Sequence, residues 1–505
     1  MTEIPPNVRP PTPEEIREMA AAHYMELSDE EVADFAAAIE GTLEGYERLD
    51  ELPSPTRERR YTDRDPGYRP DDDEDPLNAF VRKCRVEGAD DGPLAGVEVG
   101  LKDSVALAGV EMTCGSKLLE GYVPDRDATI VTRLLDAGAT ITGKLNMEDM
   151  AFSGSGELSA TGPVLNPRSE DHIAGGSSSG SIAAVVAGDV DVAIGGDQGG
   201  SIRIPAAWSG GVGHKPTHTL VPYTGVAGLG FSFDHVGPMA TSVEDCARIL
   251  DVVAGKDPDD PRQGVVETDD YRAALGGDPA ELTVAVLREG FGHEASEEGV
   301  DETVRAALED FEAAGATVEE VSVPMHLDGL PIWNGVAIEE TTATIRDEGI
   351  GKYGDGYYDE RFAEVFGRAR RAAADDYLTT LKLTLVLGEY LSQRYRGRYY
   401  AKARNLAREL RERYDEVLAD ADVLAMPTTP QTAHERRDDL ERLEVIERAL
   451  SMLPNTAPFD VTGHPAISVP AGEHDGLPVG LMFVGQRFDD ATVLRAGDAF
   501  ERQRT

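Results

Sequence analysis

Two glycine–serine loops carry the residue types that nucleophilic catalysis requires. The first is AGGSSSGS, residues 174–181, and the second is GGDQGGSIRIP, residues 195–205. In the second loop Gly199 and Gly200 precede Ser201, and two glycines let backbone N–H groups converge without obstruction by a Cβ atom. Converging N–H groups stabilise an oxyanion, so this loop predicts Ser201 as the nucleophile of an acyl transfer.

A serine nucleophile needs a base, and the chain offers two kinds. A lysine, Lys102, ends the alternating segment VGLK, and burial can depress a lysine pKa until the neutral amine is populated. Histidine is the more usual base. The candidate histidines are His172, His214, His218, His235 and His464. The residue types alone leave the choice of base open.

The first loop alone fits a linker, a phosphate-binding loop, an esterase elbow or part of another catalytic device. The elbow pattern G-x-S-x-G would make Ser178 the nucleophile, but it requires a buried strand directly before it. Residues 165–172 are polar and interrupted by Pro167, which argues against the elbow. An apolar segment follows the loop at once, which argues against a linker.

A second glycine pattern, from Gly138 to Lys144, matches the first seven places of a phosphate-binding P-loop. The eighth place is Leu145, which has no hydroxyl for magnesium. The expected order is helix then strand, whereas a P-loop requires a strand, the loop and then a helix. We therefore expect no nucleotide site here.

The elements around these loops indicate an α/β fold with a central sheet. Strands are expected at 97–101, 139–142, 190–194 and 423–426, and helices at 129–137, 181–187 and across 380–419. Before them, Thr12 and Ser28 begin helical patterns that end near Leu52. Residues 54–76 resemble an extended linker. We expect a helical domain with its linker at 1–75 and a catalytic domain at 76–505.

The charge balance excludes several classes of partner. The chain has 94 Asp and Glu against 48 Lys and Arg, a net charge of −46. Nucleic acid and anionic membranes would be repelled. Acidic residues are spread along the whole chain and arginine greatly outnumbers lysine, a pattern typical of salt-loving cells.

Other features of the composition point to a cytoplasmic protein without a cofactor or metal. The cysteines Cys84, Cys114 and Cys246 are too few and too scattered for a disulfide framework or a paired zinc site, and we expect them to be buried. No apolar run approaches the ~20 residues of a membrane span, and the N-terminus has no signal region.

The ordered set VGLKDSV, AGGSSSGSIAA and GGDQGGSIRIPAA resembles the amidase signature family. Further similar stretches include AGATITGKLNMEDMAFSG, GVGHKPTHTLVPYTGV and TGHPAISVPAG, and the resemblance runs from about Asp75 to Glu501. It implies a mixed, twisted sheet covered by helices on both faces, and amide hydrolysis through an acyl-enzyme.

The resemblance also assigns roles to individual residues. It implies Ser201 as nucleophile, Ser177 as a proton relay that follows a cis peptide bond, and Lys102 as base. It implies backbone N–H groups of Gln198, Gly199, Gly200 and Ser201 as the oxyanion hole. Asp197 and Arg203 are expected to hold the loop by hydrogen bonds.

Within the family, DQGGSIRIP followed by HKPTHTLVPYTG resembles most closely the bacterial amidases of nitrile metabolism. Those amidases carry an N-terminal helical domain with dimer contacts, which implies a homodimer and a small amide substrate. The alternative is the glutamine-hydrolysing component of a tRNA-dependent amidotransferase, which usually has glutamine where this chain has Ile204. Pocket walls are expected within residues 320–460. Trp333, Tyr353, Tyr357 and Tyr358 could line the pocket or simply pack in the core or on the surface.

Overall fold

The computed structural model describes residues 8–55, 59–351 and 354–504. It divides the chain into two compact units, Met1–Arg60 and Tyr61–Thr505. Among the described residues, no helix is both long and apolar enough to cross a membrane.

The first unit consists of two helices, α1 (Pro13–Ala22) and α2 (Asp29–Asp50). Both begin with a capping box, in which the side chains of Thr12 and Ser28 each accept a hydrogen bond from the backbone N–H of a glutamate three residues on. These two predicted helix starts are confirmed. Only Ile16, Ala20 and Val32 are buried in the two helices.

The second unit is built on a mixed sheet of twelve strands, in the order β1-β2-β4-β3-β7-β9-β8-β13-β14-β12-β10-β11, beside a two-stranded sheet of β5 and β6. The bounds are β1 (Arg64–Tyr68), β2 (Phe80–Glu87), β3 (Glu98–Lys102), β4 (Thr140–Leu145), β5 (Leu165–Asn166), β6 (Ser169–Ile173), β7 (Val192–Asp197), β8 (Val212–Lys215), β9 (His235–Ala240), β10 (Thr283–Leu287), β11 (Thr317–Val321), β12 (Val423–Pro427), β13 (Ala466–His474) and β14 (Leu477–Val484). Strand β3 is parallel to β4 and β7, and β10 is parallel to β11 and β12, while the remaining pairs are antiparallel.

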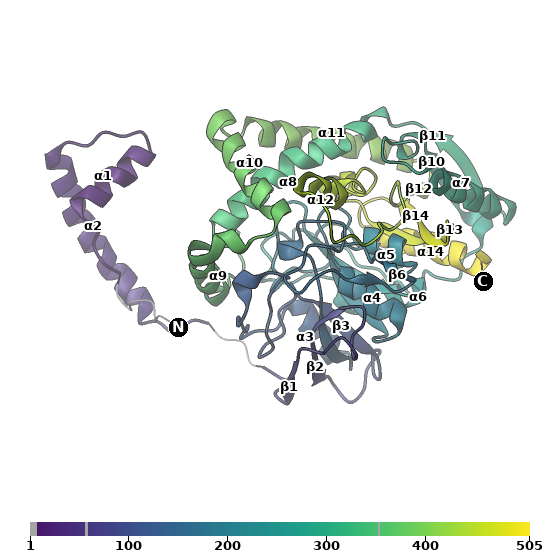
Figure 1. The fold of residues 1–505 in the computed structure, drawn as a ribbon, viewed down its shortest axis with the longest axis horizontal. Coiled ribbons are helices and arrows are strands. Elements are labelled where there is room, and N and C mark those ends of the chain that lie inside the picture. The colour runs from purple at the N-terminus through teal and green to yellow at the C-terminus, as the bar shows by residue number, and fades with distance from the viewer. Residues whose placement is uncertain (1–7, 56–58, 352–353, 505) are drawn as a thin grey trace. The chain divides into compact units, whose positions relative to one another are not determined.

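Helices surround this sheet (Figure 1). The α-helices are α3 (Thr129–Asp136), α4 (Ser179–Ala187), α5 (Arg203–Ser209), α6 (Val243–Val253), α7 (Glu298–Ala313), α8 (Gly329–Arg346), α9 (Glu360–Ala373), α10 (Thr379–Tyr395), α11 (Arg398–Leu418), α12 (Arg442–Leu450), α13 (Pro458–Thr462) and α14 (Asp490–Arg504). Short 3-10 turns lie at Lys117–Leu119, Asp149–Ala151, Pro279–Glu281, Arg288–Gly290, Pro324–Asp328 and Ala374–Asp376. The predicted α/β class with a central mixed sheet is confirmed.

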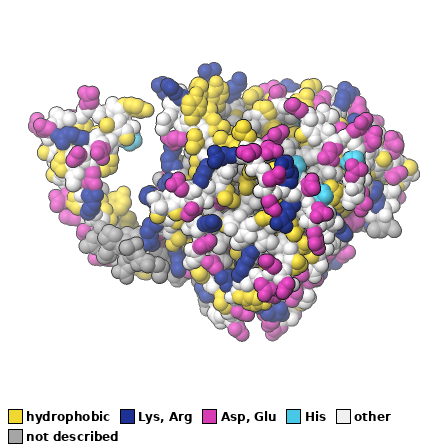
Figure 2. All heavy atoms as spheres, viewed as in Figure 1, with side chains coloured by type: hydrophobic (Ala, Val, Ile, Leu, Met, Phe, Trp, Pro, Cys, Tyr) yellow, Lys and Arg dark blue, Asp and Glu magenta, His cyan; other side chains and the backbone are white. Residues whose placement is uncertain are grey.

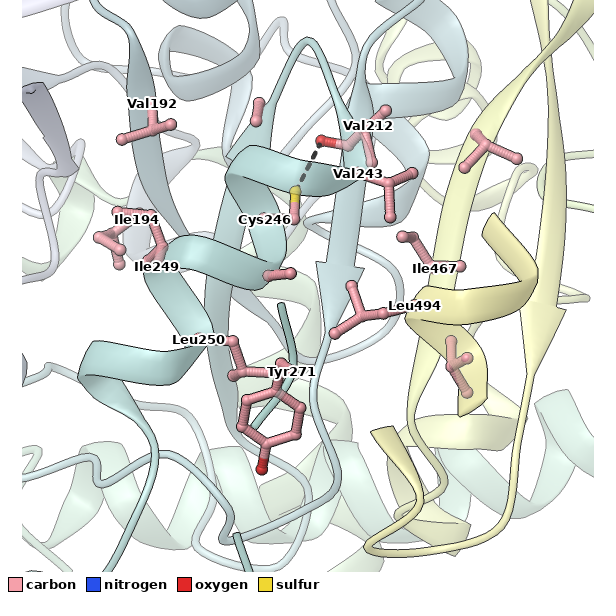
Figure 3. Packing of buried hydrophobic residues seen from close by; sticks show 14 of the residues in the cluster. Val192, Ile194, Val212, Val243, Cys246, Ile249, Leu250, Tyr271, Ile467 and Leu494 are labelled. Carbon is pink, nitrogen blue, oxygen red and sulfur yellow. Dashed lines mark hydrogen bonds between the residues drawn. The ribbon is translucent and has the colours of Figure 1, made fainter. Parts of the chain in front are cut away.

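Both faces of the large sheet are buried. Successive side chains of a strand point to opposite faces, so one strand contributes to two apolar clusters. In β12, Val423 and Ala425 join one apolar cluster, while Leu424 and Met426 join another. The first cluster packs under α3, α6, α7 and α14, and the second packs under α5, α8, α11 and α13. Figure 3 shows α6 in the first cluster, where Cys246, Ile249 and Leu250 lie among side chains of the strands. All three cysteines are buried and free, as predicted.

The segment expected to be a linker is in part a strand. Residues 64–68 form β1, which pairs antiparallel with β2 at the edge of the large sheet. The compact second unit therefore begins at Tyr61, whereas the sequence suggested a domain start at residue 76. Because it lies at the edge of the sheet, β1 pairs with only one neighbouring strand. It has no apolar alternation, so the sequence pattern did not reveal it.

Candidate active site

Lys102 lies at the end of β3, an interior strand of the sheet, and is 1% exposed. Its Nζ donates to Ser177 Oγ at 2.7 Å and to the carbonyl of Gly196 at 3.3 Å. Burial lowers the pKa of Lys102 to about 7, while the carboxylates of Asp197 and Glu148 oppose that shift. A lysine with this pKa is partly neutral near pH 7, and a neutral amine accepts a proton.

The first glycine–serine loop places two serines differently. Ser177 follows a cis peptide bond from Gly176, as the resemblance implied, and its Oγ meets Lys102. Ser178 Oγ donates to the carbonyl of Gly196 at 3.0 Å and accepts from its N–H at 3.2 Å. Strand β6 before the loop is largely solvent-accessible and belongs to the two-stranded sheet. The buried strand that an esterase elbow requires is therefore missing among the residues described before Ser178, and Ser178 is bound to the backbone.

The second loop connects β7 to α5 and is fixed by a buried ion pair. Asp197 accepts from Arg203 Nε and Nη2, both at 3.0 Å, and from the N–H of Gly200 at 2.6 Å and of Ile202 at 3.1 Å. Arg203 also donates to Asp460 at 2.9 Å. Both Asp197 and Arg203 are fully buried. They hold the loop, as expected from the sequence.

Hydrogen bonds to the loop carbonyls set the directions of its N–H groups. Trp333 Nε1 donates to the carbonyl of Gln198 at 2.7 Å, and Thr456 Oγ1 donates to that of Gly199 at 2.6 Å. In a trans peptide the N–H points opposite to the carbonyl, so the N–H of Gly199 points away from Trp333. The N–H of Gly200 is bonded to Asp197, which differs from the oxyanion-hole role expected for Gly200.

The two loops are joined directly. The N–H of Ser178 donates to the carbonyl of Ser201 at 3.3 Å. Gly200 has a φ of +135°, and a Cβ there would lie 2.4 Å from Thr456 Oγ1, so only glycine fits immediately before Ser201. The structure thus brings Lys102 into contact with Ser177, and Ser201 into contact with the residue that follows Ser177.

Glu148 is a buried carboxylate beside the first loop that no sequence motif indicated. A Cβ at Gly176 would lie 3.0 Å from its Cγ. Its carboxylate accepts from Leu158 N at 2.6 Å, from Ser153 Oγ at 3.1 Å and from Gly156 N. Burial raises the pKa of Glu148 to about 7. Glu148 lies in the family-like stretch LNMEDMAFSG, but nothing local in that stretch marks it as a neighbour of Gly176.

The other candidates have structural partners. Lys144 of the P-loop-like pattern lies in strand β4, is fully buried, and is 3.1 Å from Asp103 Oδ1. Among the described residues, none of the five candidate histidines hydrogen-bonds to Ser177 or Ser201. His214 and His464, for example, contact Asp490 and Asp415 at 3.1 and 3.0 Å. No group of His, Cys, Asp and Glu in the described parts of the chain is arranged to hold a metal.

Ser201 lines a small pocket with mostly apolar walls. The other lining residues are Ala151, Phe152, Ser153, Gly154, Gln198, Gly199, Leu229, Trp333, Leu450 and Leu453. Trp333 therefore lines the pocket, which was one of the two alternatives that the sequence left open, and it comes from the 320–460 region. Tyr357 and Tyr358 line a different pocket with Tyr223, and Tyr353 lies outside the described residues.

Comparisons with known proteins show the family to which the chain belongs. Residues 78–494 match the family model described as Amidase. The enantioselective amidase of Rhodococcus rhodochrous is 44% identical, over 98% of this chain and 96% of that protein. One component of the glutamyl-tRNA(Gln) amidotransferase of Haloarcula marismortui is also 44% identical, over 84% of this chain and 99% of that protein.

Among solved structures, the native peptide amidase from Stenotrophomonas maltophilia is 33% identical, with a TM-score of 0.68 over 82% of this chain and 84% of that one. The similarity between the two chains therefore includes the fold as well as the sequence. The chain belongs to the amidase signature family, whose enzymes hydrolyse amide C–N bonds.

Proposed function

We propose that the protein hydrolyses small apolar carboxamides to a carboxylic acid and ammonia, with Ser201 as nucleophile, Ser177 as relay and Lys102 as base. The observation that carries the proposal is the 2.7 Å contact between Ser177 Oγ and the Nζ of a buried lysine with a pKa of about 7. A neutral lysine beside a hydroxyl is what a serine hydrolase without histidine needs.

In the proposed reaction, Ser201 Oγ bonds to the amide carbon while its proton passes to Ser177 Oγ, and the proton of Ser177 passes to neutral Lys102. The oxyanion is stabilised by backbone N–H groups, for which we propose Gln198, Gly199 and Ser201, since the Gly200 N–H is bonded to Asp197. Ser177 then protonates the nitrogen and regains a proton from Lys102, the C–N bond breaks, and ammonia leaves. Water hydrolyses the ester by the same relay.

The pocket favours an apolar acyl group over glutamine. None of its lining residues carries a charge, and Phe152, Leu229 and Leu453 supply apolar surface. Glutamine would bring a charged α-amino group and a charged carboxylate, and burying unpaired charges is costly. The alignment with the Rhodococcus amidase also takes in the N-terminal helices. Both observations support a stand-alone amidase rather than a component of an amidotransferase.

A panel of primary amides tests this choice. Ammonia release is measured at molar KCl with aliphatic and aromatic amides and with glutamine. We expect apolar amides to be hydrolysed and glutamine to react more slowly by at least about tenfold, the effect of burying unpaired polar groups. Preferred hydrolysis of glutamine, together with copurifying partner proteins, would favour the amidotransferase function.

We further propose that the helical unit mediates a homodimer. It exposes large apolar side chains that two helices cannot bury by themselves: Met19, Tyr24, Met25, Phe35, Tyr46, Leu49 and Leu52. Replacing Phe35 and Leu49 together by Asp should convert a dimer to a monomer in analytical ultracentrifugation. A wild-type monomer at micromolar concentration contradicts this proposal.

A further inference from the structure

The side chain of Gln198 has a buried acceptor without a partner among the described residues. Gln198 directly follows β7, lies three residues before Ser201, and lines the same pocket. It is 4% exposed. Its Nε2 donates to Tyr223 Oη at 2.9 Å, whereas its Oε1 has no hydrogen-bond partner among the described residues. Buried unpaired acceptors are rare and costly, so this one requires an explanation.

The position of Gln198 is fixed at both ends. Its backbone carbonyl is held by Trp333, as described above. At the other end, the Tyr223 ring lies under the guanidinium of Arg262, 4.5 Å from the ring centroid, and the Tyr223 N–H donates to Asp260 at 2.9 Å. Arg262 and Asp260 form a buried ion pair at 2.9 Å. Tyr223 is therefore a rigid anchor for the Gln198 side chain, and Nε2 is the atom that it binds.

We propose that Gln198 Oε1 accepts a hydrogen bond from the N–H of the substrate carboxamide, which makes Gln198 a specificity residue for amides. The inference rests on the proposed function. A carboxamide bound for attack by Ser201 brings N–H donors into this pocket, and its other walls are largely apolar. An ester of the same acid has no N–H and leaves Oε1 unpaired. The site therefore selects an amide over the matching ester.

The hydrogen bond also bears on the leaving group. When Ser201 attacks, the amide nitrogen becomes tetrahedral and gains a lone pair that must receive the proton of Ser177. An acceptor on one N–H restricts rotation about the C–N bond and keeps that lone pair oriented. Gln198 thus acts on the nitrogen side of the reacting carbon, and the N–H groups of the oxyanion hole act on the oxygen side.

The experiment compares an apolar primary amide with the methyl ester of the same acid. The variant is Gln198→Met, which has similar length and no comparable acceptor. We expect the ratio of kcat/KM for amide over ester to fall about tenfold, the effect of one lost hydrogen bond. Leu453→Ala is the matched control, because Leu453 contributes apolar surface to the same pocket but no hydrogen-bonding group, so its loss should change both rates by the same factor.

Each outcome separates a specificity role from a structural one. An unchanged ratio in Gln198→Met, or an equal loss on both substrates, overturns the inference, because a residue that only shapes the loop affects both reactions alike. If Gln198→Met fails to fold, Tyr223→Phe decides, since it removes the anchor and should lower the same ratio by a smaller factor. A wild-type protein inactive on both substrates refutes the proposed function instead.

Discussion

Two neighbouring parallel strands, β3 and β4, carry buried lysines with different partners. Lys144 faces the carboxylate of Asp103 at 3.1 Å, with both side chains inaccessible to solvent. Lys102, on the adjacent strand, faces a hydroxyl and a carbonyl instead. A carboxylate stabilises an ammonium ion, whereas neutral partners let burial lower the pKa of Lys102 to about 7. The group that contacts a buried lysine therefore decides whether that lysine stabilises the fold or accepts protons.

The largest expected effect is the loss of activity in Lys102→Met. Without the base, kcat/KM for a primary amide should fall about a thousandfold or more. The far-UV circular dichroism spectrum should stay unchanged, because methionine fills the site of a lysine that needs no charged partner. Ser178→Ala is the control and should lose far less activity. Retention of full activity in Lys102→Met would remove Lys102 from the mechanism.

Lys144→Met should instead destabilise the protein. It leaves the buried carboxylate of Asp103 without its cation, which costs about 3–5 kcal/mol. Denaturant unfolding of this variant and of Lys102→Met at the same pH measures the difference. If both variants lose equal stability, the distinction between the two lysines fails.

The pH dependence of the acylation rate should follow the protonation of Lys102. Below its pKa of about 7 the amine is protonated and cannot accept the proton of Ser177. The acylation rate should therefore fall about tenfold per pH unit below pH 7 and level off above it. Single-turnover kinetics between pH 5 and 9 give the profile, and a rate independent of pH contradicts a lysine base.

The variant Glu148→Gln tests whether the charge of Glu148 affects the pKa of Lys102. The Glu148 carboxylate raises the pKa of Lys102, so its removal should move the pH profile towards lower pH. A shift towards higher pH would mean that Glu148 does not act on Lys102 through its charge.

Salt should change the stability of the protein, through its surface charges, more than it changes the pKa of the buried Lys102. Acidic side chains are scattered over the face shown in Figure 2, and the net charge is −46. Molar salt shortens the Debye length to about 3 Å and screens this repulsion, but it screens buried groups far less. The Tm should rise between dilute buffer and molar KCl, while the midpoint of the pH profile moves little. A flat Tm would contradict the proposed adaptation to salt.

Local sequence signals predicted the elements that begin or end at distinctive residues. The capping boxes at Thr12 and Ser28 marked both N-terminal helices, and alternation marked β3 and β7. Functional residues that are contiguous in the sequence were also recognisable, as in the loop from Asp197 to Arg203. These signals depend only on neighbours in the chain.

Contacts between distant segments were not predictable in this way. Glu148 lies against Gly176, and Trp333 against Gln198, only after the sheet and α8 have formed. The use of the Gly200 N–H by Asp197 also depends on the final loop geometry, which composition does not encode. Asp197 and Arg203 could be predicted because they belong to the loop that they hold, whereas the contact of Glu148 with the first loop exists only in the folded chain.

The identity of the acylated serine tests the central claim most directly. The protein is quenched during turnover of an apolar amide, and the acyl group is located by fragmentation mass spectrometry, with Ser201→Ala and Ser178→Ala alongside. We predict an acyl group on Ser201 in the wild type and in Ser178→Ala, and none in Ser201→Ala. An acyl group on Ser178, or one that persists in Ser201→Ala, would contradict the account.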